Sequence, residues 1–444
     1  MPQETRPQPN IVLVFADQLR SSAVGYNGNP DVRTPVMNHL AADGVVFTSA
    51  VAGCPVCTPY RACLLTGRYP LSHGLFMNDV RLPESERTFG EIYSAADYDT
   101  AYIGKWHLDG NQRLAYTPPG PRRHGFGFWA VGNCTHDYFH SLYYCDTPEP
   151  LYWEGYDAHA QARLACDYIR SRDPQRPYCL FLSWGPPHNP FEWVPQNYLD
   201  MYAPDALHIP PNTPKPVRRD LAGYYAHITA LDEALGWVLE AIRASGQEEN
   251  TIVVFTSDHG EMLGAQGYNR KQLPWDDSVL VPLIVRYPAA QRPACRVDVP
   301  INAPDLLPTL LSLCRLTIPA EVEGTDLAHL VTGTEGTAPD SALIEVIAPF
   351  SEYTGPEWRG VRTNRYTYAR TLEGPWILYD NLIDPYQVHN LVGDPAYNAL
   401  QAEMEAKLQG WLERTNDTFE PAATYRERFG HVDIDERNAI RYTP

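Results

Sequence analysis

The sequence lacks the features that direct a protein into or across a membrane. No run of about eighteen apolar residues occurs among its 444 residues, so we expect no membrane-spanning helix. The N-terminus has no basic start followed by an apolar stretch, so we expect no secretory signal. The nine cysteines are odd in number and irregularly spaced. We therefore expect mostly reduced cysteines and a cytoplasmic protein, or a periplasmic or secreted one if a leader has been removed.

Basic residues are scarce relative to acidic ones. The chain has 35 Lys and Arg against 54 Asp and Glu, a formal net charge of −19. This excess argues against nucleic acid and anionic membranes as main partners, because an acidic protein is repelled by both. An anionic small-molecule substrate would need a site with local positive charge in this acidic protein. Individual Arg and Lys side chains and metal ligands are therefore candidates for such a site.

Four apolar, β-rich runs end abruptly in polar residues. They cover residues 11–16, 99–103, 178–184 and 251–256, and helical patterns cover 36–43, 88–96, 157–171 and 220–244. Continuous apolar runs suit strands covered on both faces, and their alternation with helices predicts an α/β domain with a large, mostly parallel sheet flanked by helices. Open parallel sheets bind ligands at the carboxyl ends of their strands. The polar residues that follow the runs are therefore candidates for a site.

The pattern changes after about residue 335. Short strand patterns, then a closing helix, occur at 342–347, 360–370, 376–380 and 396–414. Short strands separated by turn residues are typical of an antiparallel sheet. We therefore predict a large α/β domain at residues 1–335 and a smaller C-terminal α+β subdomain, antiparallel in its sheet, at residues 336–444.

Residues 54–68 contain a dense motif that permits three interpretations. It could be a loop and short helix with buried cysteines. It could be a redox or zinc pair at Cys54 and Cys57, although no second pair with zinc spacing follows. The third interpretation is the pattern Cys57-x-Pro-x-Arg61 followed by Leu-Leu-Thr-Gly-Arg. Pro59 favours the first turn of a helix, which would place Cys57 at a helix N-terminus, where anions are favoured.

This third pattern resembles the signature of the formylglycine-dependent (type I) sulfatases, which belong to the alkaline phosphatase superfamily. In these sulfatases a maturation enzyme oxidises the cysteine of the motif to formylglycine. The resemblance therefore implies that Cys57 is the precursor of a nucleophile and that a formylglycine-generating enzyme is a partner. It also implies a sulfatase-like fold, and a positive charge near the nucleophile from Arg61.

Two residue pairs that follow apolar runs are candidate metal ligands. Asp17-Gln18 and Asp258-His259 offer oxygen and nitrogen ligands, although an Asp at the end of a strand is often only a turn former. The resemblance implies that they hold one divalent cation together with residue 57. Many sulfatases have Asp-Asp and Asp-Asn here, and the Gln-and-His variant also resembles phosphonate monoester hydrolases. Oxygen ligands favour Ca²⁺, our expectation, or Mg²⁺, and the imidazole favours Mn²⁺.

Three further segments resemble parts of a sulfatase active site, and together the resemblance covers about residues 10–290. The segments are Gly-Lys-Trp-His at 104–107, Pro-Pro-His-Asn-Pro-Phe at 186–191, and the region that follows Asp258. The catalytic candidates that they supply are Lys105, His107, His188 and Lys271. The candidates for substrate binding are Asn78, His136 and Asp137, for which a turn cap or an ordered loop is the alternative.

The resemblance implies hydrolysis of a sulfate ester in two steps. Hydrated formylglycine, activated by the metal, attacks sulfur while His188, near Lys271, protonates the leaving oxygen. The second hydroxyl then loses its proton to His107 and sulfate is expelled. Charge on the sulfuryl oxygens would be stabilised by the metal, Arg61, Lys105 and Lys271. Because the chain is rich in Tyr and Trp, which stack on sugars, we expect a sulfated carbohydrate or another small sulfate ester as substrate.

Two other functions stay open on the sequence alone. A phosphonate monoester or phosphodiester hydrolase would use the same residues, because it also transfers a tetrahedral anionic group. Rates on an aryl sulfate and an aryl phosphonate would separate the two enzymes. A catalytically inactive sulfoglycan-binding protein would instead keep Cys57 as a thiol and bind its ligand without it.

Overall fold

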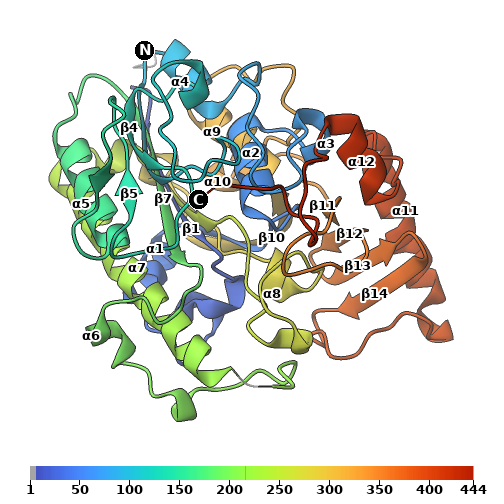
Figure 1. Ribbon diagram of the computed structural model, residues 1–444. Helices are drawn as coiled ribbons and strands as arrows, with labels where there is room; N and C mark the ends of the chain where they lie inside the picture. The colour runs from blue at the N-terminus through green and yellow to red at the C-terminus, as the bar shows by residue number, and fades with distance from the viewer. Residues whose placement is uncertain (1–6, 216, 444) are drawn as a thin grey trace.

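Two sheets of unequal size organise the chain in the computed structural model, which describes residues 7–215 and 217–443 (Figure 1). The larger sheet has eight strands in the order β10-β2-β9-β8-β1-β7-β3-β4, and the smaller has four in the order β11-β12-β13-β14. A short hairpin pairs β5 (Leu142–Tyr143) with β6 (Leu151–Tyr152). The expectation about a secretory signal rests partly on residues 1–6, which lie outside the described residues.

The four predicted strands form the centre of the larger sheet. They are, in spatial order, β8 (Thr251–Ser257), β1 (Asn10–Asp17), β7 (Tyr178–Pro187) and β3 (Asp99–Lys105). They are adjacent and mutually parallel, and almost every residue in them is buried, which explains their continuous apolar runs. Their carboxyl ends therefore open on one edge, where Asp17, Lys105 and Asp258 lie side by side.

Four strands outside the prediction complete the sheet. Three of them pair in parallel, β2 (Val45–Val51) with β10 (Cys295–Asn302), and β4 (Phe128–Gly132) with β3. The fourth, β9 (Ile284–Arg286), is antiparallel to both β2 and β8. The sheet is therefore mostly parallel, as predicted, with one short antiparallel insertion.

Helices cover both faces of this sheet. One core lies beneath α1 (Pro35–Asp43), α5 (Asp157–Arg170) and α7 (Arg218–Ala244), and the other beneath α2 (Cys57–Thr66), α4 (Phe89–Ala95) and α9 (Ala303–Leu313). The predicted patterns match α1, α4, α5 and α7 to within two residues. The shorter helices are α3 (Pro70–His73), α6 (Gln196–Leu199), α8 (Asp276–Val279) and α10 (Ala328–Thr332).

The smaller sheet is antiparallel throughout and lies beside the larger one (Figure 1). Its strands are β11 (Ser341–Val346), β12 (Trp358–Thr363), β13 (Tyr366–Thr371) and β14 (Gly374–Asp380). The single pattern predicted at 360–370 is wrong in detail, because β12 and β13 pair as a hairpin there. Helix α11 (Asn398–Arg414) packs on this sheet, and α12 (Ala422–Phe429) follows it, so α11 does not close the chain. The domain boundary at residue 335 stays a prediction.

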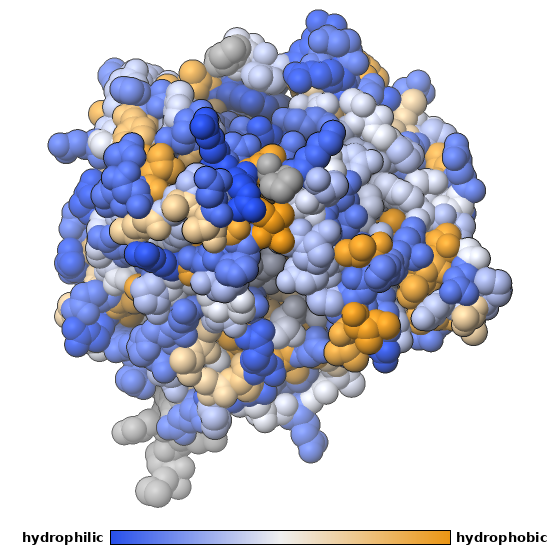
Figure 2. All heavy atoms as spheres, turned by 90° about the horizontal axis from the view of Figure 1, so that it is seen from below, coloured by the Kyte–Doolittle hydropathy of each residue, from blue (hydrophilic) through white to orange (hydrophobic). Residues whose placement is uncertain are grey.

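The molecular surface is mostly hydrophilic on the face that Figure 2 shows, and the cysteines carry free thiols. On the face shown in Figure 2, hydrophobic side chains form small separate spots among hydrophilic ones. Within residues 7–215 and 217–443, no helix combines the length and apolarity needed to cross a membrane. All nine cysteines are free, as the irregular spacing predicts.

Candidate active site

Cys57 is the first residue of α2, and its side chain is almost completely buried. The helix begins after Val56, which is extended and provides no side-chain cap. Asn78 Oδ1 instead accepts a hydrogen bond of 3.0 Å from the backbone N–H of Thr58, which satisfies one donor of the first turn. The positive end of the helix dipole therefore lies at the thiol, where it favours a negative charge.

Four potential metal ligands converge around this thiol. One ligand atom each from Asp17, Cys57, Asp258 and His259 lies within 4.8 Å of the others, and all four residues are buried. The distance from Cys57 Sγ to His259 Nε2 is 3.2 Å, and that to Asp17 Oδ1 is 3.7 Å. His259 Nδ1 lies 2.9 Å from the carbonyl oxygen of Gly260, which can only accept. His259 Nδ1 therefore carries the hydrogen, and Nε2 presents its lone pair to the cluster.

Gln18 is turned towards the same cluster by Glu261. Gln18 Nε2 donates to Glu261 Oε2 at 2.6 Å, and because a carboxylate only accepts, the amide oxygen must face the other way. That oxygen accepts a hydrogen bond of 3.1 Å from Lys271 Nζ. The backbone N–H of Gln18 donates to Asp258 Oδ1 at 3.0 Å, with Gln18 in the left-handed region (φ 73°). All five predicted metal ligands thus lie together.

Buried cations neutralise the two carboxylates of the cluster. Arg61 donates to Asp258 Oδ2 through Nε (3.2 Å) and Nη2 (2.9 Å), and Nη2 also lies 3.4 Å from Asp17 Oδ2. Lys105 Nζ donates to the same oxygen of Asp17. Arg61 is further fixed by Ser183, whose hydroxyl oxygen lies 2.7 Å from Nη1. Without these cations, two buried carboxylates would carry a large desolvation cost.

The electrostatic environment favours a negative charge on residue 57. Lys271 Nζ lies 3.3 Å and Lys105 Nζ 4.0 Å from Cys57 Sγ. Burial raises the pKa of the Cys57 thiol and Asp17 raises it further, but Lys105, Lys271 and His259 outweigh both and hold the pKa well below its usual range. An anionic group at residue 57, and an anionic substrate beside it, are therefore stabilised.

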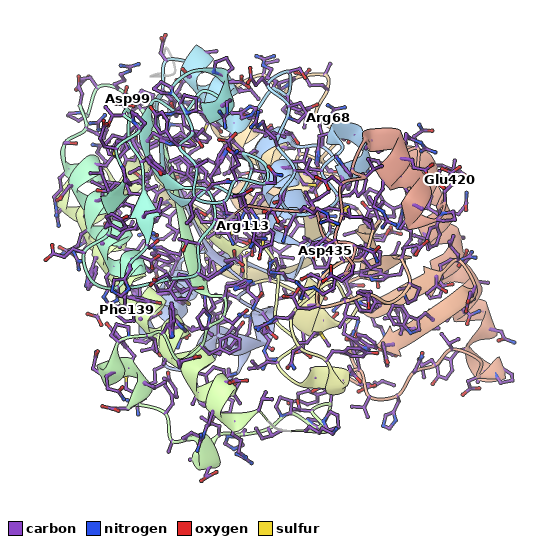
Figure 3. The ribbon with its side chains drawn as sticks, viewed as in Figure 1. Arg68, Asp99, Arg113, Phe139, Glu420 and Asp435 are labelled. Carbon is purple, nitrogen blue, oxygen red and sulfur yellow. The ribbon has the colours of Figure 1, made fainter. Side chains whose placement is uncertain are left out.

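His107 lies on another side of this cluster and is held by Asp79. His107 Nε2 is 3.3 Å from Asp79 Oδ1. Arg113, which is labelled in Figure 3, binds the same carboxylate through Nε (2.8 Å) and Nη2 (2.7 Å). Burial lowers the pKa of His107, but Cys134 and then Asp79 raise it to about 10 despite the opposing effect of Lys105. His107 Nδ1 is buried and has no hydrogen-bond partner among the described residues.

His188 and Lys271 form a second contact pair beside the thiol. Lys271 Nζ lies 3.1 Å from His188 Nε2, while His188 Nδ1 lies 2.9 Å from the carbonyl oxygen of Asn189. The carbonyl requires a hydrogen on Nδ1, so Nε2 accepts from the lysine. His136 stacks on His188 with ring centroids 4.0 Å apart, and its Nε2 is buried without a partner in the described part of the chain.

The sequence also matches two protein-family descriptions, which overlap and together span residues 9–414. Residues 9–316 match the family described as sulfatase, and residues 264–414 match the one described as N-sulphoglucosamine sulphohydrolase, C-terminal. The ulvan-active sulfatase of Formosa agariphila is 44% identical, over 99% of this chain and 88% of that protein. The chain belongs to the sulfatase family. As such it is a hydrolase of sulfuric esters, as the motif around Cys57 predicts.

Solved structures extend the similarity of this sulfatase to the whole fold. One, from work on the metabolism of multiple glycosaminoglycans by Bacteroides thetaiotaomicron, has a TM-score of 0.86 and 28% identity and covers 97% of this chain and 99% of its own. A phosphonate monoester hydrolase from Silicibacter pomeroyi has a TM-score of 0.75 and 22% identity, covering 98% and 100%. The latter shows a common fold alone.

The donor set of this sulfatase fits the metal that its family implies. Two carboxylates, an amide oxygen, an imidazole nitrogen and residue 57 face one another in a fully buried space, and the ligand atoms are prearranged by Glu261, Gly260 and Arg61. The family also implies a formylglycine, for which Cys57 stays the predicted precursor.

The three predicted substrate-binding residues have different surroundings. Asn78 caps α2 through its oxygen, which leaves its NH₂ group for other contacts. His136 lies against His188, next to the cluster. Asp137 is half-buried and accepts from the backbone N–H groups of Phe139 and His140, so it also orders its loop. Their role in substrate binding stays a prediction.

Sequence patterns missed four residues that shape the site, namely Asp79, Arg113, Ser183 and Glu261. Each acts on a predicted residue rather than on the thiol itself. Asp79 immediately follows Asn78 and Glu261 lies two residues after His259, so only their nearness to known candidates offered a signal. Arg113 lies in an irregular loop, where the sequence gives no indication of its pairing with Asp79.

Proposed function

We propose that the sulfate esters hydrolysed by this sulfatase belong to a carbohydrate, and that a formylglycine formed from Cys57 is the nucleophile. The main support is the position of Cys57: a buried residue at a helix N-terminus, between the acidic ligand cluster and two lysines. The carbohydrate is supported by the similarity to an ulvan-active sulfatase. Maturation would require a formylglycine-generating enzyme as a partner.

The proposed cation is Ca²⁺, held by residue 57 and by Asp17, Gln18, Asp258 and His259. Three oxygen donors against a single imidazole favour a hard cation over Mn²⁺. When bound, the cation would lower the pKa of the formylglycine hydrate and balance the charge of the sulfate group. Glu261 contributes by keeping the amide oxygen of Gln18 directed at the ligand cluster.

Three side chains are placed to receive the sulfuryl oxygens. Lys105 and Lys271 flank residue 57, and each brings an ammonium group into a buried space. His107 Nδ1 is a buried nitrogen that has no partner in the described residues, and a buried polar group without a partner costs about 1–3 kcal/mol. A small shift of the ring would let a sulfuryl oxygen supply that partner. The sulfate would therefore be held by fixed donors in a dry site, where such contacts are strong.

The electrostatics assign His107 a different role from the one the family resemblance implies. Burial lowers its pKa, but Cys134 and Asp79 raise it to about 10, so the ring is cationic at neutral pH. A cationic ring donates a hydrogen bond and does not accept a proton. We therefore propose that His107 stabilises the sulfate group as an imidazolium, and that the proton of the second hydroxyl passes to solvent when sulfate is expelled.

Protonation of the leaving oxygen falls to the pair of Lys271 and His188. Lys271 Nζ donates to His188 Nε2 over 3.1 Å, and His188 is half-buried whereas Lys271 is almost fully buried. His188 Nε2 would take a proton from Lys271 Nζ and donate it to the leaving oxygen, and Lys271 would regain a proton from solvent through the more exposed ring of His188.

Sulfate release by the matured protein tests this proposal. The chain would be produced with a formylglycine-generating enzyme and given ulvan fragments, an aryl sulfate and an aryl phosphonate, each with wild type and Cys57→Ala. We expect sulfate release from ulvan fragments that is lost in Cys57→Ala. Faster phosphonate hydrolysis would favour the phosphonate monoester hydrolase, and binding of sulfated saccharides without turnover would favour the inactive binding protein.

A further inference from the structure

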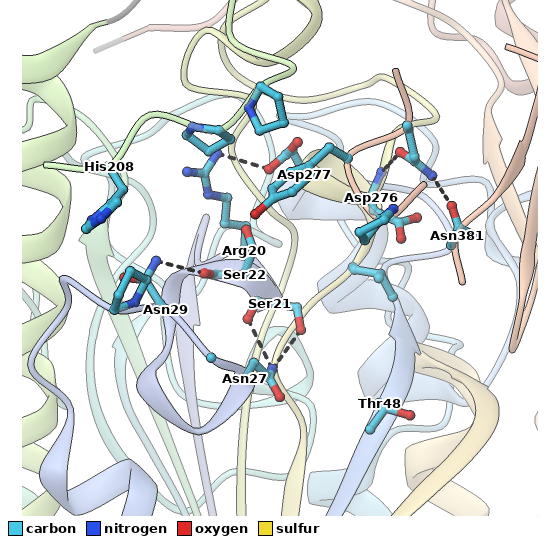
Figure 4. Close-up of a pocket in the computed structure, with 18 of the residues that line it drawn as sticks. Arg20, Ser21, Ser22, Asn27, Asn29, Thr48, His208, Asp276, Asp277 and Asn381 are labelled. Carbon is cyan, nitrogen blue, oxygen red and sulfur yellow. Dashed lines mark hydrogen bonds and ion pairs between the residues drawn. The ribbon is translucent and has the colours of Figure 1, made fainter. Parts of the chain in front are cut away.

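A cavity of about 550 Å³ lies apart from the catalytic cluster (Figure 4). Its walls come from the loop after β1 (residues 20–31), from residues 208–211, from α8 and from residues 381–387 of the smaller domain. No residue that we place in catalysis or metal binding is among the described residues that line it. Its volume lies in the range of small-ligand sites, about 300–1,000 Å³, and such sites often form between domains.

The lining carries no excess of negative charge, although the whole chain has a net charge of −19. Arg20 pairs with Asp277 and Arg362 with Asp276, and Asp31 contacts His208, which is charged only when it is protonated. Arg296 differs, because its guanidinium donates to the carbonyl oxygen of Tyr26 and to Asn27 Oδ1, which are both uncharged. The three arginines therefore balance the three carboxylates of the lining, and Arg296 is the arginine among them that is exposed and has no acidic partner in the described residues.

A buried donor in the same cavity also lacks an acceptor. The Arg20 side chain is only 4% exposed; its Nη1 donates to Asp277 and to two backbone carbonyls. Arg20 Nε has no hydrogen-bond partner in the described part of the chain. A buried donor without an acceptor is unfavourable, and a ligand oxygen would supply one if the Arg20 side chain shifted towards the cavity.

The remaining lining suits a sugar ring. Hydroxyl and amide groups of Ser21, Asn27 and Asn29 surround the space in Figure 4. Tyr386 adds an aromatic ring that is 47% exposed, whereas Tyr225, which also lines the cavity, is buried. Sugars combine hydroxyl groups that hydrogen-bond with apolar C–H faces that pack on aromatic rings, so both kinds of lining would be used.

We propose that this cavity binds an acidic sugar unit of a polysaccharide, with Arg296 pairing to its sulfate or carboxylate group. The site would hold the polymer at a distance from the residue being desulfated. The proposal rests on the proposed carbohydrate substrate, but it concerns binding and does not require turnover. It also explains how an acidic protein can hold a polyanion, because the positive and negative side chains that line this cavity balance one another.

Retention in polysaccharide-containing native gels tests the binding. The protein is used as Cys57→Ala to stop turnover, and the gels contain dextran sulfate, polygalacturonate or neutral dextran. We expect Arg296→Gln to weaken retention by roughly two- to fivefold, the range of an exposed ion pair, and the effect to shrink at high salt. Dependence on Arg296 in dextran sulfate identifies a sulfate ligand, and dependence in polygalacturonate identifies a carboxylate.

Two further variants distinguish a specific binding site from non-specific attraction of the polysaccharide to a positive charge. Tyr386→Ala removes an exposed ring without changing charge, and we expect it to weaken retention as well. Arg163→Gln removes one exposed cation from α5, outside the cavity, and should leave retention unchanged. Equal retention of wild type and Arg296→Gln in both acidic gels, or equal losses in Arg296→Gln and Arg163→Gln, would overturn the proposal.

Kinetics with matured enzyme distinguish this inference from the proposed function. Arg296→Gln should raise KM for sulfated polysaccharide by roughly the same two- to fivefold factor as in the gels. It should leave kcat/KM for an aryl sulfate unchanged. If wild type releases no sulfate from any saccharide, the carbohydrate substrate is wrong, and the gel assay still decides whether the cavity binds acidic sugars. An equal loss on both substrates would place Arg296 in catalysis and contradict the proposal.

Discussion

His107 and Asp79 face each other at 3.3 Å, and the contact continues through Arg113 to the C-terminal end of the chain. The guanidinium carbon of Arg113 lies 3.6 Å from the centre of the Tyr442 ring. The backbone of Thr443 pairs with the loop that carries Arg113, through N–H donation to the carbonyl of Asn111 at 2.8 Å. A site built at the centre of the large sheet is therefore supported by residues more than 300 positions away in sequence.

The first prediction concerns the carboxylate that holds His107. Asp79→Asn removes a negative charge that raises the pKa of His107, so this pKa should fall below about 10. If the imidazolium is the active form, the high-pH limit of kcat should move to lower pH, and kcat at neutral pH should fall about tenfold if the pKa of His107 drops to about 6. Asp109→Asn, a buried carboxylate that pairs with Arg122 instead, is the control. An unchanged pH profile in Asp79→Asn would exclude the imidazolium role.

Removal of the ring that covers Arg113 should have a smaller effect. Tyr442→Ala exposes the guanidinium and loses a cation–π contact worth about 0.5–1 kcal/mol at a surface site. We expect kcat to fall roughly two- to fivefold, with the same direction of pH shift as in Asp79→Asn and no change in melting temperature. Tyr442→Phe keeps the ring and should behave as wild type. A loss of activity in Tyr442→Phe equal to that in Tyr442→Ala would mean that the hydroxyl matters instead.

Glu261 should control metal affinity without binding the metal. Glu261→Gln removes the charge that fixes the amide of Gln18, so the amide oxygen is no longer held towards the cluster. Residues that orient metal ligands typically change affinity by about 10–100-fold, and we expect an effect near the lower value in a Ca²⁺ titration. Glu323→Gln is a matched control, because Glu323 also accepts backbone and side-chain hydrogen bonds but far from the cluster. Equal Ca²⁺ affinity in both variants would contradict this account of Gln18.

Asp157 predicts a pH dependence of stability that is independent of catalysis. Burial raises the pKa of this carboxyl, at the start of α5, to about 8. The folded protein therefore keeps the proton from about pH 4 to about pH 8, whereas the unfolded chain releases it near pH 4. The stabilisation from this proton is complete below pH 4 and is lost as pH rises to about 8. Asp157→Asn should therefore gain about 2–4 kcal/mol relative to wild type between pH 5 and pH 8, in urea unfolding. A difference that does not vary with pH would show that the carboxyl is ionised throughout.

The central strands were predictable because their burial on both faces leaves continuous apolar runs. The polar residues at their ends, such as Asp17 and Asp258, were therefore predictable too, and the motif around Cys57 predicts the nucleophile. Strand β9 has three residues and β2 has seven, so neither stood out from other short apolar runs in the sequence. The contacts of Asp79, Arg113 and Glu261 depend on loops that meet only in the folded chain. Those contacts, together with the cavity at Arg296, have no signature in local sequence.

The most direct test of the central claim is the mass of the peptide that contains residue 57, measured on protein of known specific activity. We expect active protein to contain an aldehyde or its hydrate in place of the Cys57 thiol, and the specific activity to rise in proportion to the modified fraction. Full activity in protein whose Cys57 is an unmodified thiol would contradict the formylglycine nucleophile.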